Sequence, residues 1–263
     1  MSGPFIDIPD NNIGYWSPAT ASVDWCEENY AYTPYVAELW NVISMAPMLF
    51  ICVLGNVQAR RHSYGYSFHL VYTLLGIVAI GSVFFHTTLL YSGQVMDELP
   101  MIWGTIGGLY IALEREREAK YPWLGPALAV YAVVFTSAYF LTPEYFYLFL
   151  ISYIGGLIAS VYLSVQVLRA PGCPPGQVRL VKYGVVIMVA GGILWFLENL
   201  YCPTLRGWHF HAMFHVTCAA GPHLWLCFAA WDRLVHAFKR RARLEFPLSW
   251  CRVPVVVDVG RMV

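Results

Sequence analysis

The stretch SFHLVYTLLGIVAIGSVFFHTTLL, residues 67–90, decides the fold. It contains no Asp, Glu, Lys or Arg, and it exceeds the ~20 residues that an α-helix needs to cross the hydrocarbon core of a bilayer. Near its far end stands His86, an ionisable side chain in a place where burial in lipid is costly. The stretch therefore predicts a membrane-spanning helix that carries a candidate functional residue.

The composition of the whole chain points the same way. Of its 263 residues, 58% are hydrophobic and 12% are charged, whereas soluble domains have roughly 45–50% and about 25%. The formal net charge is zero, so nothing indicates a nucleic-acid partner. The first residues lack a basic region followed by an apolar core, so we expect the first membrane helix, and no cleavable signal peptide, to direct targeting.

Seven apolar stretches predict an all-α membrane protein with seven transmembrane helices. Proline, glycine and charge separate them, as in QARRHSYGYS after the first and RAPGCPPGQVRLVK after the fifth. The predicted spans are residues 37–57, 67–90, 99–115, 125–142, 145–168, 181–201 and 210–236. They divide the chain into an N-terminal segment (1–36), a membrane domain (37–236) and a basic C-terminal tail (237–263).

Lysine and arginine fall almost entirely on one side of these spans. That side holds Arg60, Arg61, Arg115, Arg117, Lys120, Arg169, Arg179, Lys182, Lys239, Arg240, Arg241 and Arg243. The loops on the opposite side carry Arg206. Because positively charged loops stay in the cytoplasm, we expect a cytoplasmic C-terminus and a lumenal or extracellular N-terminus.

Three histidines then share the lumenal side at similar depth. His86 lies near the end of the second span, while His211 and His215 begin the seventh and share a helix face because they are four residues apart. A single histidine near a helix end is more often a hydrogen-bonded packing residue than a ligand. Three imidazoles with one open position, however, form a catalytic zinc site, where the metal lowers the pKa of bound water to about 7.

A carboxylate near such a metal would complete a hydrolase. Asp97 lies on the same side, where it could take a proton from the zinc water and return it to a leaving amine. Ser82, one helical turn before His86, could donate a hydrogen bond to the oxyanion or orient the water. Taken singly, Asp97 is better explained as a charge at a helix N-terminus, and Ser82 as a packing hydroxyl.

Four sequence blocks resemble the alkaline ceramidase family of integral membrane amidases. They are GSVFFH, MDELP, HAMFH and WSPATASVDWCEENY, the last followed by Glu38. The similarity runs from about Asn12 to the end of the seventh predicted span. The family belongs to a wider group of seven-helix proteins that includes the adiponectin and progestin receptors, and the DWCEENY block favours the ceramidases within it.

The resemblance implies a reaction and assigns residues to it. His86, His211 and His215 would hold zinc. Asp97 would transfer protons, and Ser82 would lie near the zinc water or the oxyanion. The reaction would be hydrolysis of the N-acyl bond of ceramide to a sphingoid base and a fatty acid, in the membrane of the endoplasmic reticulum or the Golgi. Ceramide-type lipid and membrane lipids are therefore the expected partners.

The acidic block near the N-terminus is a candidate calcium site. DWCEENY clusters the hard oxygen ligands that calcium prefers, without the spacing or central glycine of an EF-hand loop. From the residues alone, a solvated acidic turn is at least as good an explanation. The resemblance favours calcium, with ligands from the side chains of Asp24, Glu27, Asn29 and Glu38 and from the carbonyl of Trp25.

Four more positions are candidates for supporting roles. Cys26 and Cys202 share the oxidising side, so a disulfide is permitted between them, with two free thiols as the alternative. Tyr153 in the fifth span is a candidate for contact with polar groups of the substrate, although a membrane tyrosine usually packs. Glu198 stands where the resemblance leads us to expect aspartate, and a hydrogen bond to a zinc-ligating histidine would suit it.

Two other classes of function remain open. A receptor of the adiponectin type would share the zinc site and the seven helices. The resemblance implies the opposite membrane orientation for such receptors, with a cytoplasmic N-terminus, whereas the arginines here predict a lumenal one. A transporter or channel would use His and Asp as a proton relay. Transporters often show spans broken in the middle and internal repeats, and the sequence shows neither. We therefore expect the zinc-dependent amidase.

Overall fold

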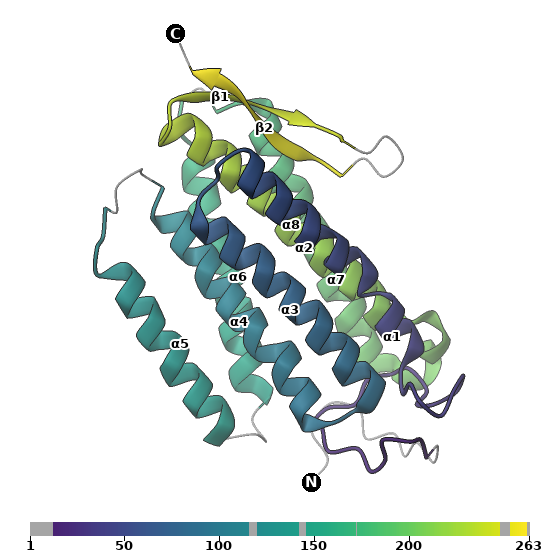
Figure 1. The fold of residues 1–263 in the computed structure, drawn as a ribbon. Helices are drawn as coiled ribbons and strands as arrows, with labels where there is room; N and C mark the ends of the chain where they lie inside the picture. Colours follow the sequence, from purple (N-terminus) through teal and green to yellow (C-terminus); the bar gives the residue numbers. More distant parts are fainter. Residues whose placement is uncertain (1–12, 116–119, 142–145, 172, 248–252, 262–263) are drawn as a thin grey trace.

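A helix forms at each place where a membrane span is predicted. The computed structural model describes residues 13–115, 120–141, 146–171, 173–247 and 253–261. Its elements are α1 (Leu39–Ile43), α2 (Ala46–Arg61), α3 (Tyr66–Thr88), α4 (Tyr91–Leu113), α5 (Leu124–Leu141), α6 (Phe146–Leu168), α7 (Pro175–Leu205), the 3-10 helix η1 (Arg206–Trp208), α8 (Phe210–His236), β1 (Arg240–Glu245) and β2 (Val255–Arg261). Figure 1 shows the long helices side by side, with the N-terminal segment at one end and the β1–β2 hairpin at the other.

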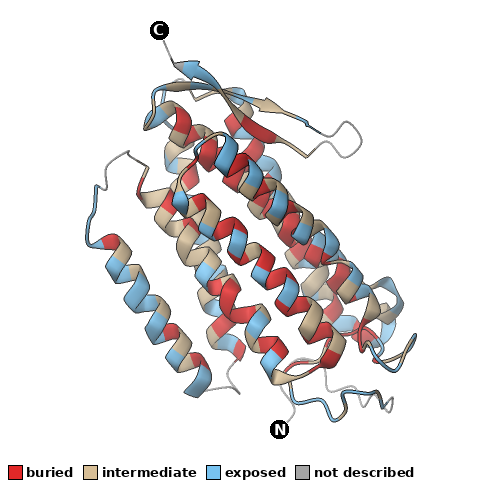
Figure 2. Cartoon of the chain, in the orientation of Figure 1, coloured by how far each residue is buried: buried red, intermediate tan, exposed pale blue. Residues whose placement is uncertain are grey.

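Five of the described helical segments are long and apolar enough to cross a membrane: Leu39–Arg61, Tyr66–Thr88, Leu124–Leu141, Phe146–Leu168 and Pro175–Trp208. Apolar side chains on the outside of the bundle are exposed, among them Val133 on α5, Ile158 on α6 and Val189 on α7. Figure 2 shows these exposed faces around a buried interior. Extensive apolar surface is expected where lipid covers the protein, so the chain is a mostly helical, multi-pass membrane protein.

The helices α4 and α8 match the third and seventh predicted spans but are less apolar than the other five. They are 23 and 27 residues long, and they pack against α3 and α7 respectively. Asp97 and Glu98 lie on α4, and His211, His215 and His223 lie on α8. These two less apolar helices thus belong to the same bundle as the other five.

The first predicted span is interrupted near its N-terminal end. The short helix α1 ends at Ile43, and α2 begins at Ala46 with Pro47 in its first turn. Proline has no backbone N–H to donate to a preceding turn, which explains why the helix restarts here. The interruption leaves Ser44 between two helices, at the level of the candidate site.

Two helices begin earlier than predicted. α4 begins at Tyr91 rather than at 99, because Gln94 donates a hydrogen bond to Glu98 at 2.9 Å and these polar groups are accommodated inside the protein. Asp97 therefore lies well inside α4 and is not at its N-terminus. α7 begins at Pro175 rather than at 181, with its proline in the first turn, where a missing N–H costs nothing. The predicted boundaries at 142 and 145, and Arg117, lie outside the described residues.

Residues 237–263, predicted as a basic tail, form an antiparallel hairpin in their described part. Ala242 and Leu244 of β1 pack against the core, while the arginines that alternate with them are exposed. Val256 of β2 is fully buried, and its carbonyl accepts a hydrogen bond from the hydroxyl of Tyr64. Alternation of this kind is typical of a strand packed on one face, so a two-stranded sheet is added to the predicted all-α fold.

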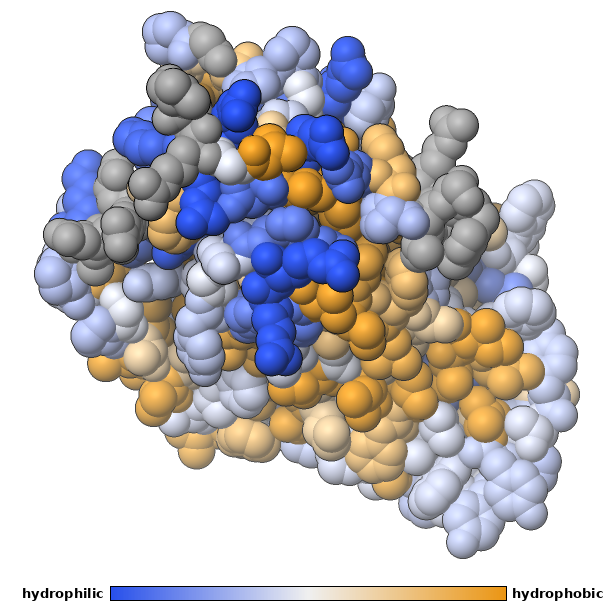
Figure 3. Space-filling view, turned by 45° about the horizontal axis from the view of Figure 1, so that its top comes forward, coloured by the Kyte–Doolittle hydropathy of each residue, from blue (hydrophilic) through white to orange (hydrophobic). Residues whose placement is uncertain are grey.

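The hairpin end is also the charged end of the bundle. Arg61 ends α2, Lys182 lies in the first turns of α7, and Arg240 begins β1. Figure 3, which brings this end forward, shows strongly hydrophilic residues gathered here and hydrophobic residues over the flank. Arg206 lies at the other end, where its Nε donates to the carbonyl of Cys26. The fold therefore separates the basic groups in the way that the sequence predicted.

Candidate metal centre and active site

Three buried histidines converge at the end of the bundle opposite the hairpin. His86 comes from the last turn of α3, and His211 and His215 come from the first two turns of α8. One ring nitrogen from each lies within 4.8 Å of the other two, and the residues are 0%, 4% and 6% exposed. No other group of three His, Cys, Asp or Glu in the described part of the chain is as close. The structure thus brings together the three residues that topology placed at one depth.

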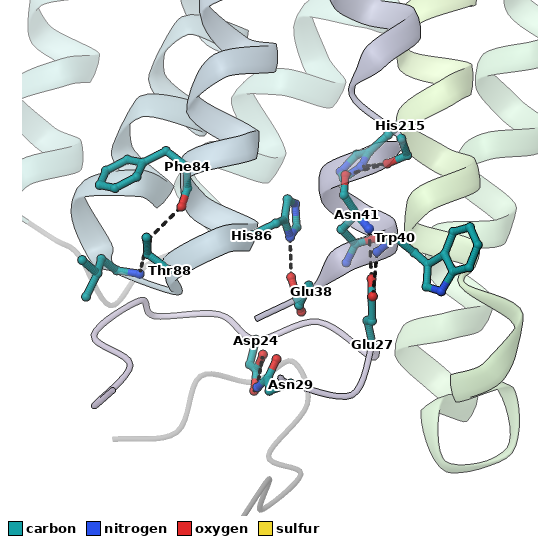
Figure 4. A network of polar contacts seen from close by, with 12 residues as sticks. Asp24, Glu27, Asn29, Glu38, Trp40, Asn41, Phe84, His86, Thr88 and His215 are labelled. Carbon is teal, nitrogen blue, oxygen red and sulfur yellow. Dashed lines mark hydrogen bonds and ion pairs between the residues drawn. The ribbon is translucent and has the colours of Figure 1, made fainter. Parts of the chain in front are cut away.

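Two of these imidazoles have a partner on their second nitrogen. The carboxylate of Glu38 contacts Nδ1 of His86, and Ser44 Oγ lies 2.8 Å from Nδ1 of His215. Figure 4 shows Glu38 beneath His86, with both side chains pointing toward each other. Metal-binding histidines almost always have such a partner, which fixes the orientation of the ring.

The remaining ring nitrogens have the properties expected of metal ligands. Nε2 of His86 and Nδ1 of His211 are buried without a hydrogen-bond partner among the described residues. An orphaned buried nitrogen is costly, and a bound cation would remove that cost. Three imidazoles with an open fourth position are the donor set of catalytic zinc sites, so the residues present fit a zinc ion.

The N-terminal segment covers this end of α3. The last carbonyl groups of a helix have no partner within the helix. Here the N–H groups of Ala37 and Glu38 donate to the carbonyls of Thr87 and His86, at 3.0 and 2.9 Å. The segment therefore places Glu38 against His86 by backbone bonds as well as through its side chain.

The side chain of Trp25 has a position that the sequence did not indicate. Its indole stacks on the ring of His211, with 4.0 Å between ring centroids and 17° between ring planes. The sequence assigned only the Trp25 carbonyl, to calcium. The stacked indole instead forms part of the wall around the histidine cluster, and it separates that cluster from the outside.

Ser82 and Asp97 come together because α3 and α4 approach each other closely. Ser82 is buried and lies one turn before His86 on the same face of α3. Gly81 makes the approach possible, since a Cβ there would lie 2.1 Å from the carbonyl oxygen of Met96. Asp97 follows Met96 and lies within interaction distance of Ser82.

Glu98, the neighbour of Asp97, ties α4 to α5. Its carboxylate accepts hydrogen bonds from Tyr139 on α5 at 2.7 Å and from Gln94 at 2.9 Å. Gln94 in turn accepts from the backbone N–H of Ser22 at 2.8 Å. Tyr153 on α6 stacks on Phe149 and interacts electrostatically with Asp97, so it packs inside the bundle near that carboxylate, and its contact with substrate stays a prediction.

The residues predicted to bind calcium occupy one region of the N-terminal segment, with separate partners. Asn29 Nδ2 donates to the carboxylate of Asp24 at 3.1 Å, and Glu38 faces His86, as Figure 4 shows. Glu27 accepts from the backbone N–H groups of Trp40 and Asn41 at 2.7 and 2.9 Å, so it caps the start of α1.

Two buried carboxylates lie near Glu27. Burial raises the pKa of Glu27 to about 7, the two backbone hydrogen bonds oppose that rise, and the nearby charge of Glu38 adds to it. Glu198 on α7 is 2% exposed and interacts electrostatically with both. Among the described residues Glu198 forms no hydrogen bond to a histidine ring, although the backbone N–H of His211 faces its carboxylate. Three acidic side chains in one buried place favour a cation.

A disulfide joins the N-terminal segment to α7. It links Cys26 to Cys202, with 5.5 Å between the Cα atoms. The sequence permitted this bond without requiring it. Cys26 lies next to Trp25 in the chain, so the cross-link helps to hold the indole over His211.

Ser44 and the Trp25 indole are the site residues that sequence reasoning missed. Both make their contacts with α8, which lies far away in the chain. A serine three residues before a proline is compatible with a helix start, and a tryptophan in a polar block is unusual. Neither signal specifies which histidine the side chain would meet.

Comparison with known proteins identifies relatives over most of the chain. The sequence model of the family described as Ceramidase matches residues 17–257. Alkaline ceramidase 3 of Mus musculus is 28% identical over 250 residues, which cover 89% of this chain and 91% of the relative. The alkaline ceramidase of Arabidopsis thaliana is 29% identical over 217 residues, covering 80% and 82%. Alkaline ceramidase 1 of Homo sapiens is 27% identical over 214 residues, covering 75% and 77%.

Proposed function

This chain belongs to the ceramidase family, and we propose that it is a zinc-dependent amidase that cleaves the N-acyl bond of ceramide within the membrane. Water adds across the amide, which releases a sphingoid base and a free fatty acid. The relatives named alkaline ceramidase align over most of their length, which supports the substrate class. The observation that carries the proposal is the buried trio of His86, His211 and His215, with Ser82 one turn before His86 and Asp97 within reach of Ser82.

A zinc ion held by the three imidazoles would polarise the amide carbonyl and lower the pKa of a water molecule to about 7. Glu38 and Ser44 keep the rings of His86 and His215 in one orientation. The Trp25 indole and the buried ends of α3 and α8 keep bulk water away from the cluster, which strengthens electrostatic interactions there.

Asp97 moves the proton in this proposal. It accepts a proton from the attacking water and delivers it to the nitrogen of the leaving sphingoid base. Ser82 lies beside Asp97 and one turn from His86, where its hydroxyl donates a hydrogen bond that orients the water or stabilises the oxyanion. Tyr153, near Asp97, contacts hydroxyl groups of the substrate.

The proposed arrangement in the membrane has seven crossings, with α1 and α2 as one span. The hairpin end carries the basic residues and faces the cytoplasm, and the histidine end faces the lumen. The disulfide at the histidine end is consistent with an oxidising compartment. The proposed address is the endoplasmic reticulum or the Golgi membrane, and fractionation with a protease-protection assay at each end tests it.

Calcium is proposed as a second cation, bound by the N-terminal segment. The ligands would be the side chains of Asp24, Glu27, Asn29 and Glu38 and the carbonyl of Trp25, and the nearby carboxylate of Glu198 adds negative charge. Because Glu38 and Trp25 also contact the histidine cluster, order in this segment supports catalysis indirectly. Calcium titration followed by thermal unfolding is expected to raise the midpoint for the native protein, and less so for Glu27→Gln.

The central experiment offers purified protein a ceramide with an isotope-labelled acyl chain and measures release of labelled fatty acid by mass spectrometry. Metal-stripped protein is expected to be inactive and to recover when zinc is added back. Asp97→Asn is expected to lower kcat roughly 10²–10⁴-fold, the usual effect of losing a general base. Glu98→Gln is the matched control, since it removes the neighbouring carboxylate and keeps the size of the side chain, and it should stay within about tenfold of native activity.

Two outcomes would contradict the proposal. One is ceramide hydrolysis by stripped protein at the rate of zinc-loaded protein. The other is an Asp97→Asn variant that hydrolyses ceramide at the native rate. A zinc-loaded protein that leaves ceramide intact would favour the receptor alternative.

A further inference from the structure

A narrow cleft opens at the hairpin end of the bundle, roughly 30 Å along α8 from the histidines at 1.5 Å per residue. It is partly open to the outside, and its walls come from the ends of α4, α6 and α8. Apolar side chains form most of the wall, namely Ile111, Leu163, Val167, Phe228 and Ala229. Arg115, Asp232 and Arg233 also line it.

The charges of the cleft do not cancel. Arg115 donates from Nε and Nη2 to the two carboxylate oxygens of Asp232, each at 2.7 Å, so these two side chains form a neutral pair. Arg233 adds a second guanidinium. Its Nη1 donates to the carbonyl of Glu114 at 3.3 Å, while its Nε is buried with no hydrogen-bond partner among the described residues. The described residues of the lining therefore carry two guanidinium groups and one carboxylate, and Nε of Arg233 is a donor without a hydrogen-bond partner among them.

The surroundings of Arg233 make that unused donor more costly. The N-terminus of α3, at Gly65, has no side-chain cap, and a Cβ on Gly65 would lie 3.4 Å from Nη2 of Arg233. The positive end of a 23-residue helix thus faces a positive guanidinium. An anion in the cleft would satisfy the buried N–H and offset this repulsion.

We propose that the cleft binds a phospholipid with an anionic head group. Its phosphate meets the guanidinium group of Arg233, whose planar N–H donors suit phosphate oxygens. One acyl chain lies along the apolar wall between α4 and α6. The site lies where the spans end, at the depth of lipid head groups. A free phosphate ion would satisfy Arg233 but leave the apolar wall uncovered, so the lipid is the occupant that uses both parts. The proposal does not depend on the reaction at the other end.

Native mass spectrometry of delipidated protein tests this proposal. Phosphatidylserine and phosphatidylcholine with identical acyl chains are titrated against the native protein. Two variants are compared with it: Arg233→Gln, which removes the charge in the cleft, and Arg241→Gln, which removes an exposed charge on β1 at the same end. Phosphatidylserine is expected to bind the native protein and Arg241→Gln equally. Its affinity for Arg233→Gln should fall about tenfold, as expected for a lost charge-assisted hydrogen bond.

A third variant and a head-group probe test the acyl-chain part of the proposal. Ala112→Leu fills the cleft from α4 without changing its charge and should weaken phosphatidylserine binding. Equal binding of phosphatidylserine to Arg233→Gln and native protein would overturn the site. Equal losses of phosphatidylserine affinity in Arg233→Gln and Arg241→Gln would show that surface charge alone attracts the lipid, which would also overturn the site. Glycerophosphoserine binding as tightly as the intact lipid would overturn the role of the apolar wall. Retained ceramide hydrolysis in every variant separates this result from the fate of the proposed function.

Discussion

The two ends of the bundle treat their polar groups in opposite ways. At the histidine end, Glu38, Ser82 and His86 are at most 1% exposed, and they lie beside other polar groups in the interior. At the hairpin end, charged groups pair in the open, as Arg243 does with Glu245, whose side chains are 65% and 40% exposed. Charges interact strongly in a dry interior and weakly at a wet surface. One end therefore keeps its polar groups in a dry interior, and the other exposes them to solvent.

A pair of histidines on one helix makes the difference concrete. His211 and His223 both lie on α8 and are 4% and 3% exposed. His223 uses both ring nitrogens, toward the hydroxyl of Tyr72 at 3.2 Å and the carbonyl of Pro254 at 2.8 Å. His211 has a buried Nδ1 without a partner among the described residues. Burial alone therefore does not mark a candidate metal ligand, whereas an unused nitrogen among other buried histidines does.

The largest difference in activity is expected between two variants in which either His211 or His223 is replaced by alanine. His211→Ala is expected to lose the metal and to lower ceramide hydrolysis by about 10³-fold or more, because a ligand has been removed. His223→Ala should keep the metal and lose about 1–3 kcal/mol of stability, since two hydrogen bonds in the interior are broken. Metal content by elemental mass spectrometry and thermal unfolding measure the two effects. Equal metal loss in both variants would contradict the claim that His211, and not His223, binds the metal.

The close approach of α3 and α4 is expected to matter nearly as much. Gly81→Ala would place a methyl group 2.1 Å from the Met96 carbonyl oxygen, so the helices must separate and carry Ser82 away from Asp97. A displacement of about 1 Å can cost 10²-fold in rate. Gly108→Ala on α4 is the matched control, because its methyl group would make ordinary contact with the Trp225 ring at 3.6 Å. The rate of ceramide hydrolysis is measured for both variants. Similar rates in Gly81→Ala and Gly108→Ala would refute the positioning role of Gly81.

Ser44 should produce a smaller effect, confined to the metal. Ser44→Ala removes the hydrogen-bond partner of His215 Nδ1 and is expected to weaken metal binding about tenfold. Ser137→Ala, which loses a bond to the Val133 carbonyl on exposed α5, is the control and should change nothing. Competition with a chelator measures the affinities. An unchanged affinity in Ser44→Ala would mean that the partner does not orient the ring.

The smallest effect is expected at the hairpin. Burial raises the pKa of Asp258, but the N–H of Gly260 and the guanidinium of Arg240 outweigh it, so the pKa lies below its ordinary value. A lowered pKa stabilises the folded state above the unfolded value of about 3.9, and this stabilisation is lost as the pH falls through the folded value. Asp258→Asn should therefore loosen the hairpin by less than about 1 kcal/mol at pH 7.

Hydrogen exchange of residues 255–261 measures that change. The difference between native protein and Asp258→Asn should vanish in strong acid, while ceramide hydrolysis at neutral pH stays unchanged. A difference that persists below the folded pKa would mean that the carboxylate charge is not its cause.

The sequence could predict what depends on short-range patterns. Apolar runs placed every long helix, and the side of each span placed His86, His211 and His215 at one level before any distance was known. The start of α4 could not be found this way, because Glu98 is accommodated by Tyr139 on another helix. The alternation in RRARLE is compatible with a strand. The same arginines also indicate a cytoplasmic tail, and this is how the segment was predicted.

Contacts between distant segments account for the rest of the site. The stacking of Trp25 on His211, the bond from Ser44 to His215 and the carboxylate of Glu38 on His86 each join parts of the chain that no spacing rule connects. The disulfide between Cys26 and Cys202 is of the same kind, permitted by compartment and decided by distance. These contacts become visible only when the N-terminal segment is seen folded over the bundle.

The inner strand of the hairpin has a practical consequence for anyone shortening this protein. Carbonyl groups of Pro254 and Val256 receive the hydrogen bonds of His223 and Tyr64 from inside the bundle. The basic sequence after α8 looks like a tail that could be removed. A protein truncated after α8 would leave the donors of His223 and Tyr64 facing an apolar interior without acceptors. Such a truncated protein would be recovered in poor yield. Its low activity in an assay would then reflect the small amount of folded protein, although all of the proposed catalytic residues are intact.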